Sequence, residues 1–182
     1  MISAPSGAGK TSIVHYLMEN IHQLSFSISC TSRKKRDNEI DGRDYYFLSP
    51  DEFQKKIESK EFIEWEEVYP NQFYGTLNSE IDRIFDQERI AIFDIDVDGG
   101  INIKNKYRQD CLSIFITPPS LLILEQRLRQ RGSESEKDLS DRIEKSQQEM
   151  KKKHQFDKVI LNDDLKDACT KAFDLIIGFI NN

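Results

Sequence analysis

The chain has 182 residues, a net charge of −6 and 32% charged residues, a length typical of one domain that can bury its own core. The acidic balance argues against a general binder of nucleic-acid backbone, which usually carries a basic surplus. No apolar run approaches the roughly 20 residues needed to cross a bilayer and no basic-then-apolar leader opens the chain, so we expect neither nucleic acid nor membrane as a partner.

Short β-like runs alternate with segments of helical periodicity, a pattern typical of an α/β fold with a largely parallel sheet. Because helices cover both faces of such a sheet, its strands are nearly continuous apolar runs. The strands predicted for this core are Phe26–Ser29, Ile90–Ile95, Leu112–Ile116 and Lys158–Leu161. The predicted helices are Lys10–Asn20, Ser120–Gln130, Leu139–Lys153 and Leu165–Ile180.

The first chemical motif matches the phosphate-binding pattern G-x-x-x-x-G-K-[ST], with Ala4 in place of the first glycine. Small residues let backbone N–H groups curl around a phosphate, and the following helix offers its positive N-terminus. We expect Lys10 to reach the β- and γ-phosphates and Thr11 to coordinate Mg²⁺. The residues predicted to bind ATP here are Ala4, Pro5, Ser6, Gly7, Ala8, Gly9, Lys10 and Thr11.

The loop begins unusually close to the start of the chain, since only residues 1–3 precede it. A phosphate-binding loop normally follows a buried strand. We therefore expect either a very short first strand or, as we favour, native N-terminal residues that this chain lacks.

Residues 32–88 do not continue the alternation and indicate an inserted α+β lobe. Ser49-Pro-Asp-Glu52 is a capping box with proline at the first helical position, which predicts a short helix through Lys60. The other elements expected in the lobe are strand-like segments at Tyr45–Leu48 and Phe62–Val68 and a loop that carries Asn71 and Gly75.

The lobe also carries side chains that suit a phosphomonoester. Arg33 and Arg36 lie three residues apart, and the paired tyrosines Tyr45 and Tyr46 follow them. Guanidinium groups and phenol hydroxyls both donate hydrogen bonds to phosphate oxygens. These residues therefore indicate a phosphorylated acceptor.

Two carboxylates end the apolar run that begins at Ile90. Asp94 and Asp96 are two residues apart, so they project to one face of the strand. Open α/β sheets bind ligands at the carboxyl ends of their strands. We expect one of these aspartates to hold the magnesium shell and the other to touch an acceptor.

The segment 127–142 is rich in arginine and then runs Ser-Glu-Ser-Glu. It has too few apolar residues to pack as core, so we expect a mobile flap.

Taken together, the motifs resemble the guanylate kinase family, whose members pass a phosphoryl group from ATP to GMP. The resemblance covers essentially the whole chain. It rests on Ala4–Thr11, Thr31-Ser-Arg33…Arg36, Gly42-Arg-Asp-Tyr45, Glu61-Phe-Ile-Glu64-Trp65, Tyr74-Gly75-Thr76, Asp94-Ile-Asp96, Pro118-Pro-Ser120, Arg127…Arg131-Gly132 and Leu161-Asn-Asp-Asp164.

The resemblance implies a P-loop three-layer core with a parallel sheet, an inserted α+β lobe that binds GMP, and a helical lid. The expected core comprises 1–31, 89–126 and 152–182, the lobe 32–88 and the lid 127–151. In this family pattern the GMP phosphate is held by Arg33, Arg36, Tyr45 and Tyr74, and the guanine is surrounded by Ser29, Glu64, Thr76 and Asp96.

Guanine chemistry agrees with the expected role of Glu64. The Watson–Crick edge of guanine offers N1–H and N2–H donors, both of which one carboxylate can accept. Adenine lacks these donors, and a buried Glu64 facing it would stay unpaired. Sites built around such bonds discriminate by roughly 10⁴-fold or more.

The remaining implied residues lie on the ATP side. Arg127, Arg131 and Arg142 are expected to close over the ATP phosphates, Asn162 to lie near the adenine, and Asp94 to join Thr11 at the metal. The residues expected to act in catalysis are Lys10, Arg33, Arg131 and Arg142.

We expect in-line transfer from MgATP to GMP without a general base, because the attacking phosphate oxygen is already ionised. Two alternatives stay open. One is a related kinase that acts on another phosphorylated acceptor such as a ribose bisphosphate. The other is a guanylate-kinase-like scaffold domain that binds phosphopeptides, although such domains typically lose parts of the phosphate loop.

Three scattered cysteines, Cys30, Cys111 and Cys169, fit neither a disulfide framework nor a metal motif. They favour a reducing, cytoplasmic location. The sequence leaves the oligomeric state open.

Overall fold

A computed structural model describes residues 1–130 and 136–181 of the chain. The chain divides into two compact units: residues 1–22 with 94–182 form the first, and residues 23–93 form the second. The lobe expected at 32–88 lies within the second unit, which also takes in 23–31 and 89–93. No helix among the described residues is long and apolar enough to pass through a bilayer.

The first unit is built on a four-stranded parallel sheet with the strand order β10-β9-β1-β8. Its strands are β1 (Ile2–Ser3), β8 (Asp94–Ile95), β9 (Ile114–Thr117) and β10 (Lys158–Leu161). Its helices are α1 (Lys10–Asn20), α4 (Val97–Tyr107), α5 (Leu121–Gln130), α6 (Glu136–Lys151) and α7 (Leu165–Ile180), with 3-10 turns at Arg108–Asp110 and Lys153–Gln155.

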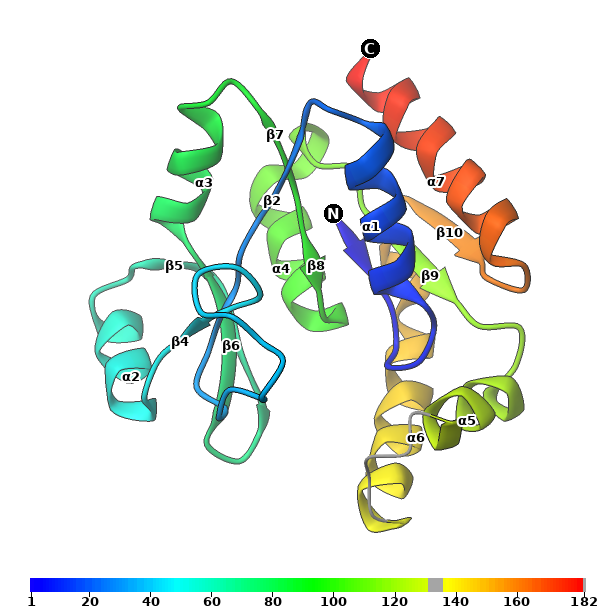
Figure 1. The fold of residues 1–182 in the computed structure, drawn as a ribbon, viewed down its shortest axis with the longest axis horizontal. Helices are drawn as coiled ribbons and strands as arrows, with labels where there is room; N and C mark the ends of the chain where they lie inside the picture. Colours follow the sequence, from blue (N-terminus) through cyan, green and yellow to red (C-terminus); the bar gives the residue numbers. More distant parts are fainter. Residues whose placement is uncertain (131–135, 182) are drawn as a thin grey trace. The chain divides into compact units, whose positions relative to one another are not determined.

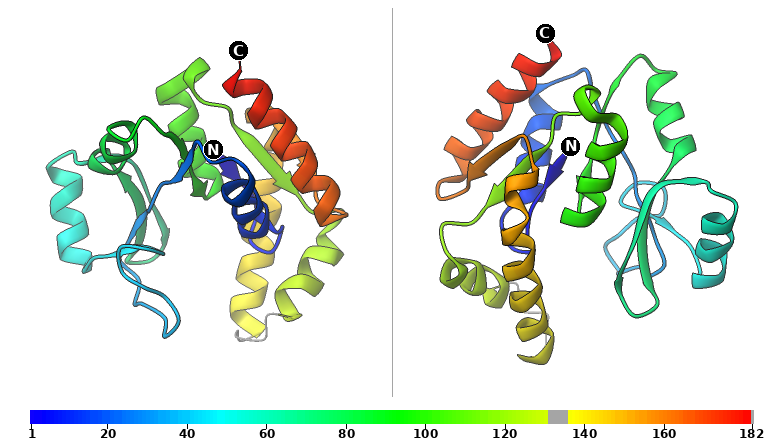
Figure 2. Two further views of the ribbon diagram at one scale, coloured as in Figure 1. Left: turned by 45° about the horizontal axis from the view of Figure 1, so that its top comes forward. Right: turned by 180° about the vertical axis from the view of Figure 1, so that it is seen from behind.

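Helices cover both faces of this sheet, with α1 and α7 on one side and α4 and α6 on the other (Figures 1 and 2). On the second face, Val97 of α4 packs with Phe115 of β9 and with Phe156. All four residues of β9 are buried, as expected for an inner strand covered on both faces. The expected α/β fold with a parallel sheet is therefore confirmed.

The second unit contains a mixed four-stranded sheet with the order β4-β3-β6-β5 and a separate parallel pair, β2 with β7. Its strands are β2 (Leu24–Phe26), β3 (Cys30–Thr31), β4 (Tyr46–Phe47), β5 (Phe62–Tyr69), β6 (Gln72–Leu77) and β7 (Ile90–Ile92). Its helices are α2 (Pro50–Glu58) and α3 (Asn78–Phe85).

The predicted capping box starts α2 as expected. The Ser49 side chain accepts a hydrogen bond from the Glu52 amide, and the Glu52 carboxylate accepts one from the Ser49 amide. The helix then buries Phe53, whose ring stacks on Phe62 at a centroid distance of 4.4 Å and lies 5.4 Å from the ring of Phe73. This aromatic cluster is the core of the lobe.

Several predicted boundaries were wrong. The strand predicted at Ile90–Ile95 divides at Phe93, because Ile90–Ile92 pairs with β2 while Asp94–Ile95 pairs with β1. The strand predicted at Phe26–Ser29 also differs, since β2 ends at Phe26 and β3 begins at Cys30. Ser29 therefore lies between two strands.

The loop expected around Asn71 and Gly75 is mostly strand β6, which pairs with both β3 and β5. Gly75 is required there because a Cβ would lie 2.8 Å from the Glu64 carbonyl oxygen and from the Trp65 Cβ. The sequence pattern did not predict this strand, because a glycine within a strand weakens it. The strand forms nevertheless, because β6 is paired on both of its sides.

The expected flap was predicted to have too few apolar residues to pack as core, but leucines in its described part are buried. Leu128 of α5 and Leu139 of α6 are 3% and 6% exposed and form one cluster with Leu124 and Ile143. A few leucines at helical spacing are enough to join the two helices. Arg131 and Gly132 lie outside the described residues.

Candidate functional site

The phosphate loop connects β1 to α1 in the first unit. Gly7 and Gly9 have φ values of +86° and +92°, a region that side chains rarely adopt and that glycine reaches without strain. Ala4 is buried at 5% exposure and is not among the positive-φ residues of the described chain. The position therefore needs only a small side chain, which explains why alanine replaces the first glycine of the pattern.

Asp94 bridges the two functional side chains of this loop. Lys10 Nζ lies 2.5 Å from Asp94 Oδ1 and donates to the Ile95 carbonyl at 2.7 Å. Thr11 Oγ1 donates to Asp94 Oδ2 at 3.2 Å. The predicted group of Lys10, Thr11 and Asp94 is therefore brought together, although the motifs that supply it are more than eighty residues apart.

One hydroxyl and one carboxylate are hard oxygen donors of the kind Mg²⁺ prefers, with the remaining positions left to water and phosphate. Among the described residues no group of three acidic, histidine or cysteine side chains converges on one point. Thr11 and Asp94 are the residues of this site that could hold a magnesium ion.

Asn162, at the end of β10, meets the loop directly. Its Nδ2 donates to the Ala8 carbonyl at 2.7 Å, and the side chain is 3% exposed. Arg127 of α5 donates to the Asn162 backbone carbonyl at 3.1 Å. A pocket of about 410 Å³ opens here, lined by Gly7, Gly9, Ser12, Arg127, Gln130, Asn162, Asp163 and Leu165.

Arg142 of α6 also reaches the loop, since its Nη1 lies 3.5 Å from Ser6 Oγ. Arg129, two residues after Arg127 and so on a different side of α5, pairs instead with Glu125 on the helix surface. Arg142 thus contacts the loop itself, and Arg127 contacts Asn162 beside it; their closing over the ATP phosphates stays a prediction. The third predicted arginine, Arg131, lies outside the described residues.

In the second unit, Arg33, Tyr45 and Tyr74 form one cluster. Arg33 Nε donates to Tyr74 Oη at 3.1 Å, and the guanidinium lies 5.0 Å from the centre of the Tyr45 ring. The two tyrosine rings meet edge to face at 6.0 Å. These three predicted residues come together from separate parts of the lobe.

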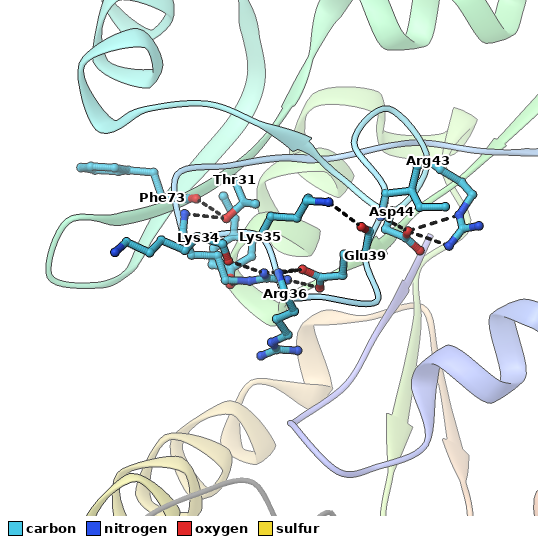
Figure 3. A network of polar contacts seen from close by, with 11 residues as sticks. Thr31, Lys34, Lys35, Arg36, Glu39, Arg43, Asp44 and Phe73 are labelled. Carbon is cyan, nitrogen blue, oxygen red and sulfur yellow. Dashed lines mark hydrogen bonds and ion pairs between the residues drawn. The ribbon is translucent and has the colours of Figure 1, made fainter.

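Glu39 belongs to the same cluster and was not predicted. Its carboxylate accepts hydrogen bonds from both terminal nitrogens of Arg33, at 2.7 and 2.5 Å, and from the Arg36 amide at 2.9 Å (Figure 3). These hydrogen bonds lower the pKa of Glu39 to about 2. A carboxylate three residues after Arg36, in the register of the two arginines, is the sequence signal that could have indicated it.

Arg36 differs from Arg33. Only its amide takes part in the cluster, and Figure 3 shows its side chain pointing away from the Glu39 carboxylate. The residue is exposed. Arg36 therefore presents a cation to the solvent side of this loop, whereas the charge of Arg33 is neutralised.

Glu64 and Thr76 face each other across strands β5 and β6, and both are buried, at 6% and 0% exposure. Thr76 Oγ1 has no hydrogen-bond partner within the described part of the chain. A buried hydroxyl without a partner is costly, so Thr76 is a candidate for a hydrogen bond to a bound ligand. Ser27, another buried side chain whose oxygen lacks such a partner there, was not predicted.

Asp96 has a local structural role that the sequence prediction missed. It is not part of β8 but the N-cap of α4, where its Oδ1 accepts a hydrogen bond from the Gly99 amide at 2.8 Å. Asp94 and Asp96 therefore do not lie on one strand face as predicted.

The molecule thus carries two sets of groups suited to phosphates. The first unit combines a glycine loop, a lysine, two arginines and an oxygen pair for a metal, which suits a nucleoside triphosphate. The second combines arginines, tyrosine hydroxyls and a buried carboxylate–hydroxyl pair, which suits a small phosphomonoester with hydrogen-bond donors on its ring.

Comparison with known proteins agrees with this chemistry. The sequence matches the guanylate kinase family over residues 1–177. It is 44% identical to the guanylate kinase of Salinibacter ruber over 183 residues, covering 100% of this chain and 96% of that protein. It is 45% identical to that of Porphyromonas gingivalis over 181 residues, covering 99% and 96%. The crystal structure of guanylate kinase from Anaplasma phagocytophilum superposes with a TM-score of 0.79 at 27% identity, covering 97% of this chain and 82% of that one.

Proposed function

The chain belongs to the guanylate kinase family, and from this membership and the two sites we propose that it transfers the γ-phosphoryl group of ATP to GMP, giving ADP and GDP. The single observation that carries the proposal is the completeness of the first site. Gly9, Lys10 and Thr11 are all present, and Asp94 contacts both functional side chains. A module that only binds phosphopeptides has no need of this arrangement.

On the ATP side we assign the β- and γ-phosphates to the loop of residues 4–11 and to Lys10. Arg127 and Arg142 contact the loop region in the described structure and add positive charge where negative charge develops during transfer. Arg131, from the same family motif, completes the proposed set. Asn162 and the pocket beside it supply the proposed adenine site.

We assign Thr11 and Asp94 to Mg²⁺, which enters with ATP. When bound, the ion would neutralise phosphate charge in the transferring group. Within the protein itself, Asp94 keeps Lys10 and Thr11 together beside the loop.

On the acceptor side we assign the GMP phosphate to Arg33, Arg36, Tyr45 and Tyr74, three of which already cluster. We assign the guanine to Glu64 and Thr76, together with Ser29 and Asp96 from the family pattern. The buried Thr76 hydroxyl supports this assignment because a guanine edge would supply its absent partner. The carboxylate of Glu64 accepts from guanine N1–H and N2–H, which adenine does not offer.

The chemistry requires no general base. A phosphate monoester has its second pKa near 6, so the attacking oxygen of GMP is ionised at neutral pH. That oxygen bonds to the γ-phosphorus as the bond to the β–γ bridging oxygen breaks, and ADP leaves. The protein contributes positioning and charge neutralisation, as in other phosphoryl transfers.

We further propose that the core, the lobe at 32–88 and the lid at 127–151 act as the three parts typical of the family. The three cysteines are free, which supports a reducing, cytoplasmic location.

The direct test is an assay that couples ADP release to a chromogenic reaction, with MgATP and GMP, run beside AMP, UMP and no acceptor. ADP release that depends on GMP alone supports the proposal. Equal release with all acceptors, or release without any acceptor, would indicate a different ATPase or kinase. Binding of GMP or a phosphopeptide without turnover would indicate the scaffold alternative.

A further inference from the structure

Ser29, which the family pattern assigns to the guanine, lies just outside the sheet of the second unit. Strand β3 begins one residue later and pairs with β6 in the register that sets Cys30 opposite Gly75. Continued by one residue, this register would place Ser29 opposite Thr76, which itself pairs with Glu64 on β5. Residues directly opposite one another share a face of a sheet. Ser29, Thr76 and Glu64 therefore form one row, which we call the guanine row.

Contacts other than strand pairing hold Ser29 at the end of this row. In the described chain the pairing of β3 with β6 covers only the two residues of β3. The Tyr46 amide donates to the Ser29 carbonyl at 2.9 Å. One residue earlier, the Ile28 amide donates to the Glu80 carboxylate at 2.8 Å. Glu80 therefore fixes the backbone of the segment that carries Ser29.

The carboxylate of Glu80 is buried, at 3% exposure of the residue, and both its oxygens are engaged. Arg83 donates to them through Nη2 at 2.7 Å and Nε at 3.0 Å, and the Tyr46 hydroxyl lies at 3.3 Å. Arg83 Nη2 also donates to the Phe26 carbonyl at 3.2 Å. Together with the bond to Ile28, these contacts hold the chain on both sides of residue 27.

The same stretch of chain carries Thr76 and Glu80. Strand β6 ends at Leu77 and helix α3 begins at Asn78, with no residue between them. Glu80 lies in the first turn of this helix, where the helix dipole favours a carboxylate. It therefore ties the strand that brings Thr76 into the guanine row to the segment that brings Ser29 there.

We propose that Glu80 is a positioning residue for guanine recognition and acts through Ser29. This inference rests on the proposed function. The bond from Glu80 to the Ile28 amide keeps Ser29 in the guanine row. A purine ring is planar and rigid, so the groups that bind it must keep their spacing, and a small displacement of one of them costs affinity. Glu80 itself does not touch the nucleotide.

The first test is Glu80→Ala, which removes the acceptor of the Ile28 amide. We expect the KM for GMP to rise roughly tenfold, the scale of one hydrogen bond, and the KM for ATP to stay as in the wild type. Glu80→Gln keeps one acceptor oxygen for the Ile28 amide, so it should raise the KM for GMP by a clearly smaller factor. The matched control is Asp82→Asn, at an exposed position of the same helix, which should change neither KM.

A second readout separates the base from the phosphate. Affinities for GMP, for guanosine and for ribose 5-phosphate, which has the phosphate but no base, are compared in the wild type and in Glu80→Ala. Because Glu80 acts on guanine recognition, GMP and guanosine should lose affinity by the same factor while ribose 5-phosphate does not. A loss shared by all three ligands would mean general damage to the lobe and would overturn the inference.

A third readout tests whether Glu80 acts through Ser29. Ser29→Ala alone should weaken GMP binding. In the double variant Ser29→Ala/Glu80→Ala, the second substitution should add little, because the hydroxyl to be positioned is already gone. Additive losses would show that Glu80 acts elsewhere, contrary to the inference.

A second variant keeps these tests usable if Glu80→Ala does not fold. Glu80→Asp then takes its place in all three, because it keeps a charge beside Arg83 but is one methylene too short to reach the Ile28 amide. An unchanged KM for GMP in the folded variant would contradict the inference and leave the proposed function intact. Failure of the proposed function itself is recognised separately, because the wild-type protein would then release no ADP in response to GMP.

Discussion

The Nδ2 amide of Asn162 donates a 2.7 Å hydrogen bond to the carbonyl oxygen of Ala8, 154 residues earlier in the chain. This bond joins the end of β10 to the phosphate loop. The same nitrogen would lie 2.3 Å from a Cβ placed on Gly9. The family resemblance places Asn162 near the adenine, and the structure adds that its side chain braces the loop on which the ATP phosphates are proposed to bind.

We therefore expect Asn162→Ala to raise the KM for ATP more than the KM for GMP and to lower stability by about 1–3 kcal/mol, the cost of leaving a buried carbonyl unpaired. Thermal unfolding and steady-state kinetics measure the two effects.

Gly9→Ala should lower stability more in the wild type than in the Asn162→Ala background, where the clash is removed and only the backbone strain remains. Equal costs in both backgrounds would contradict the contact.

Lys10→Ala should reduce turnover by roughly 10³-fold or more, because charge neutralisation supplies most of the catalysis in phosphoryl transfer. Binding of GMP should persist, since Lys10 belongs to the first unit and its partners there are Asp94 and the Ile95 carbonyl. A coupled ADP assay and calorimetry with GMP check the two statements. Loss of GMP binding together with turnover would contradict the separate assignment of the two substrates.

Thr76→Val should leave the free protein as stable as the wild type, or more stable, because the hydroxyl that it removes is buried without a hydrogen-bond partner in the described chain. The KM for GMP should nevertheless rise by roughly tenfold if guanine supplies that partner. Thermal unfolding and kinetics provide the readouts.

Thr31→Val is the matched control for stability. Thr31 is equally buried, but its hydroxyl donates to the Phe73 carbonyl at 3.1 Å and accepts from the Arg33 amide at 3.3 Å. Thr31→Val should therefore destabilise the protein. A large stability loss in Thr76→Val as well would show that its hydroxyl already has a partner.

The buried carboxyl of Glu149 should make the stability of the protein depend on pH. It is 7% exposed, and burial raises the pKa of its carboxyl from 4.5 to about 7 against the attraction of Lys145. The folded protein thus retains a proton that the unfolded chain releases, so stability falls as the pH rises from about 4.5 to about 7. Glu149→Gln should flatten the Tm across this window, whereas Glu144→Gln, at an exposed position of the same helix, should not.

Much of the architecture follows from local sequence. The bounds of α1, α7 and β10 were predicted as the structure has them, because their apolar spacing and end signals are contained within each segment. The phosphate loop is equally local: glycines that adopt positive φ, followed by a helix that begins with Lys10 and Thr11, form a site within eight residues. Motif order also pointed to Arg33, Tyr45 and Tyr74, which do cluster.

Other features depend on pairing across long stretches of chain. Strand β6 forms because β3 and β5 flank it, although Gly75 disfavours a strand. The predicted strand at 90–95 divides because its two ends pair with different strands.

The sequence by itself determined which chemical groups this protein has, since the phosphate loop, the arginines and the carboxylates can be recognised as motifs. Only the tertiary structure decided which of those groups are engaged with one another. It neutralised Arg33 with Glu39, made Asp96 a helix cap and turned Asn162 toward Ala8. Hydrogen bonds and ion pairs act over a few ångströms in space, and the order of residues along the chain does not say which of them lie that close together.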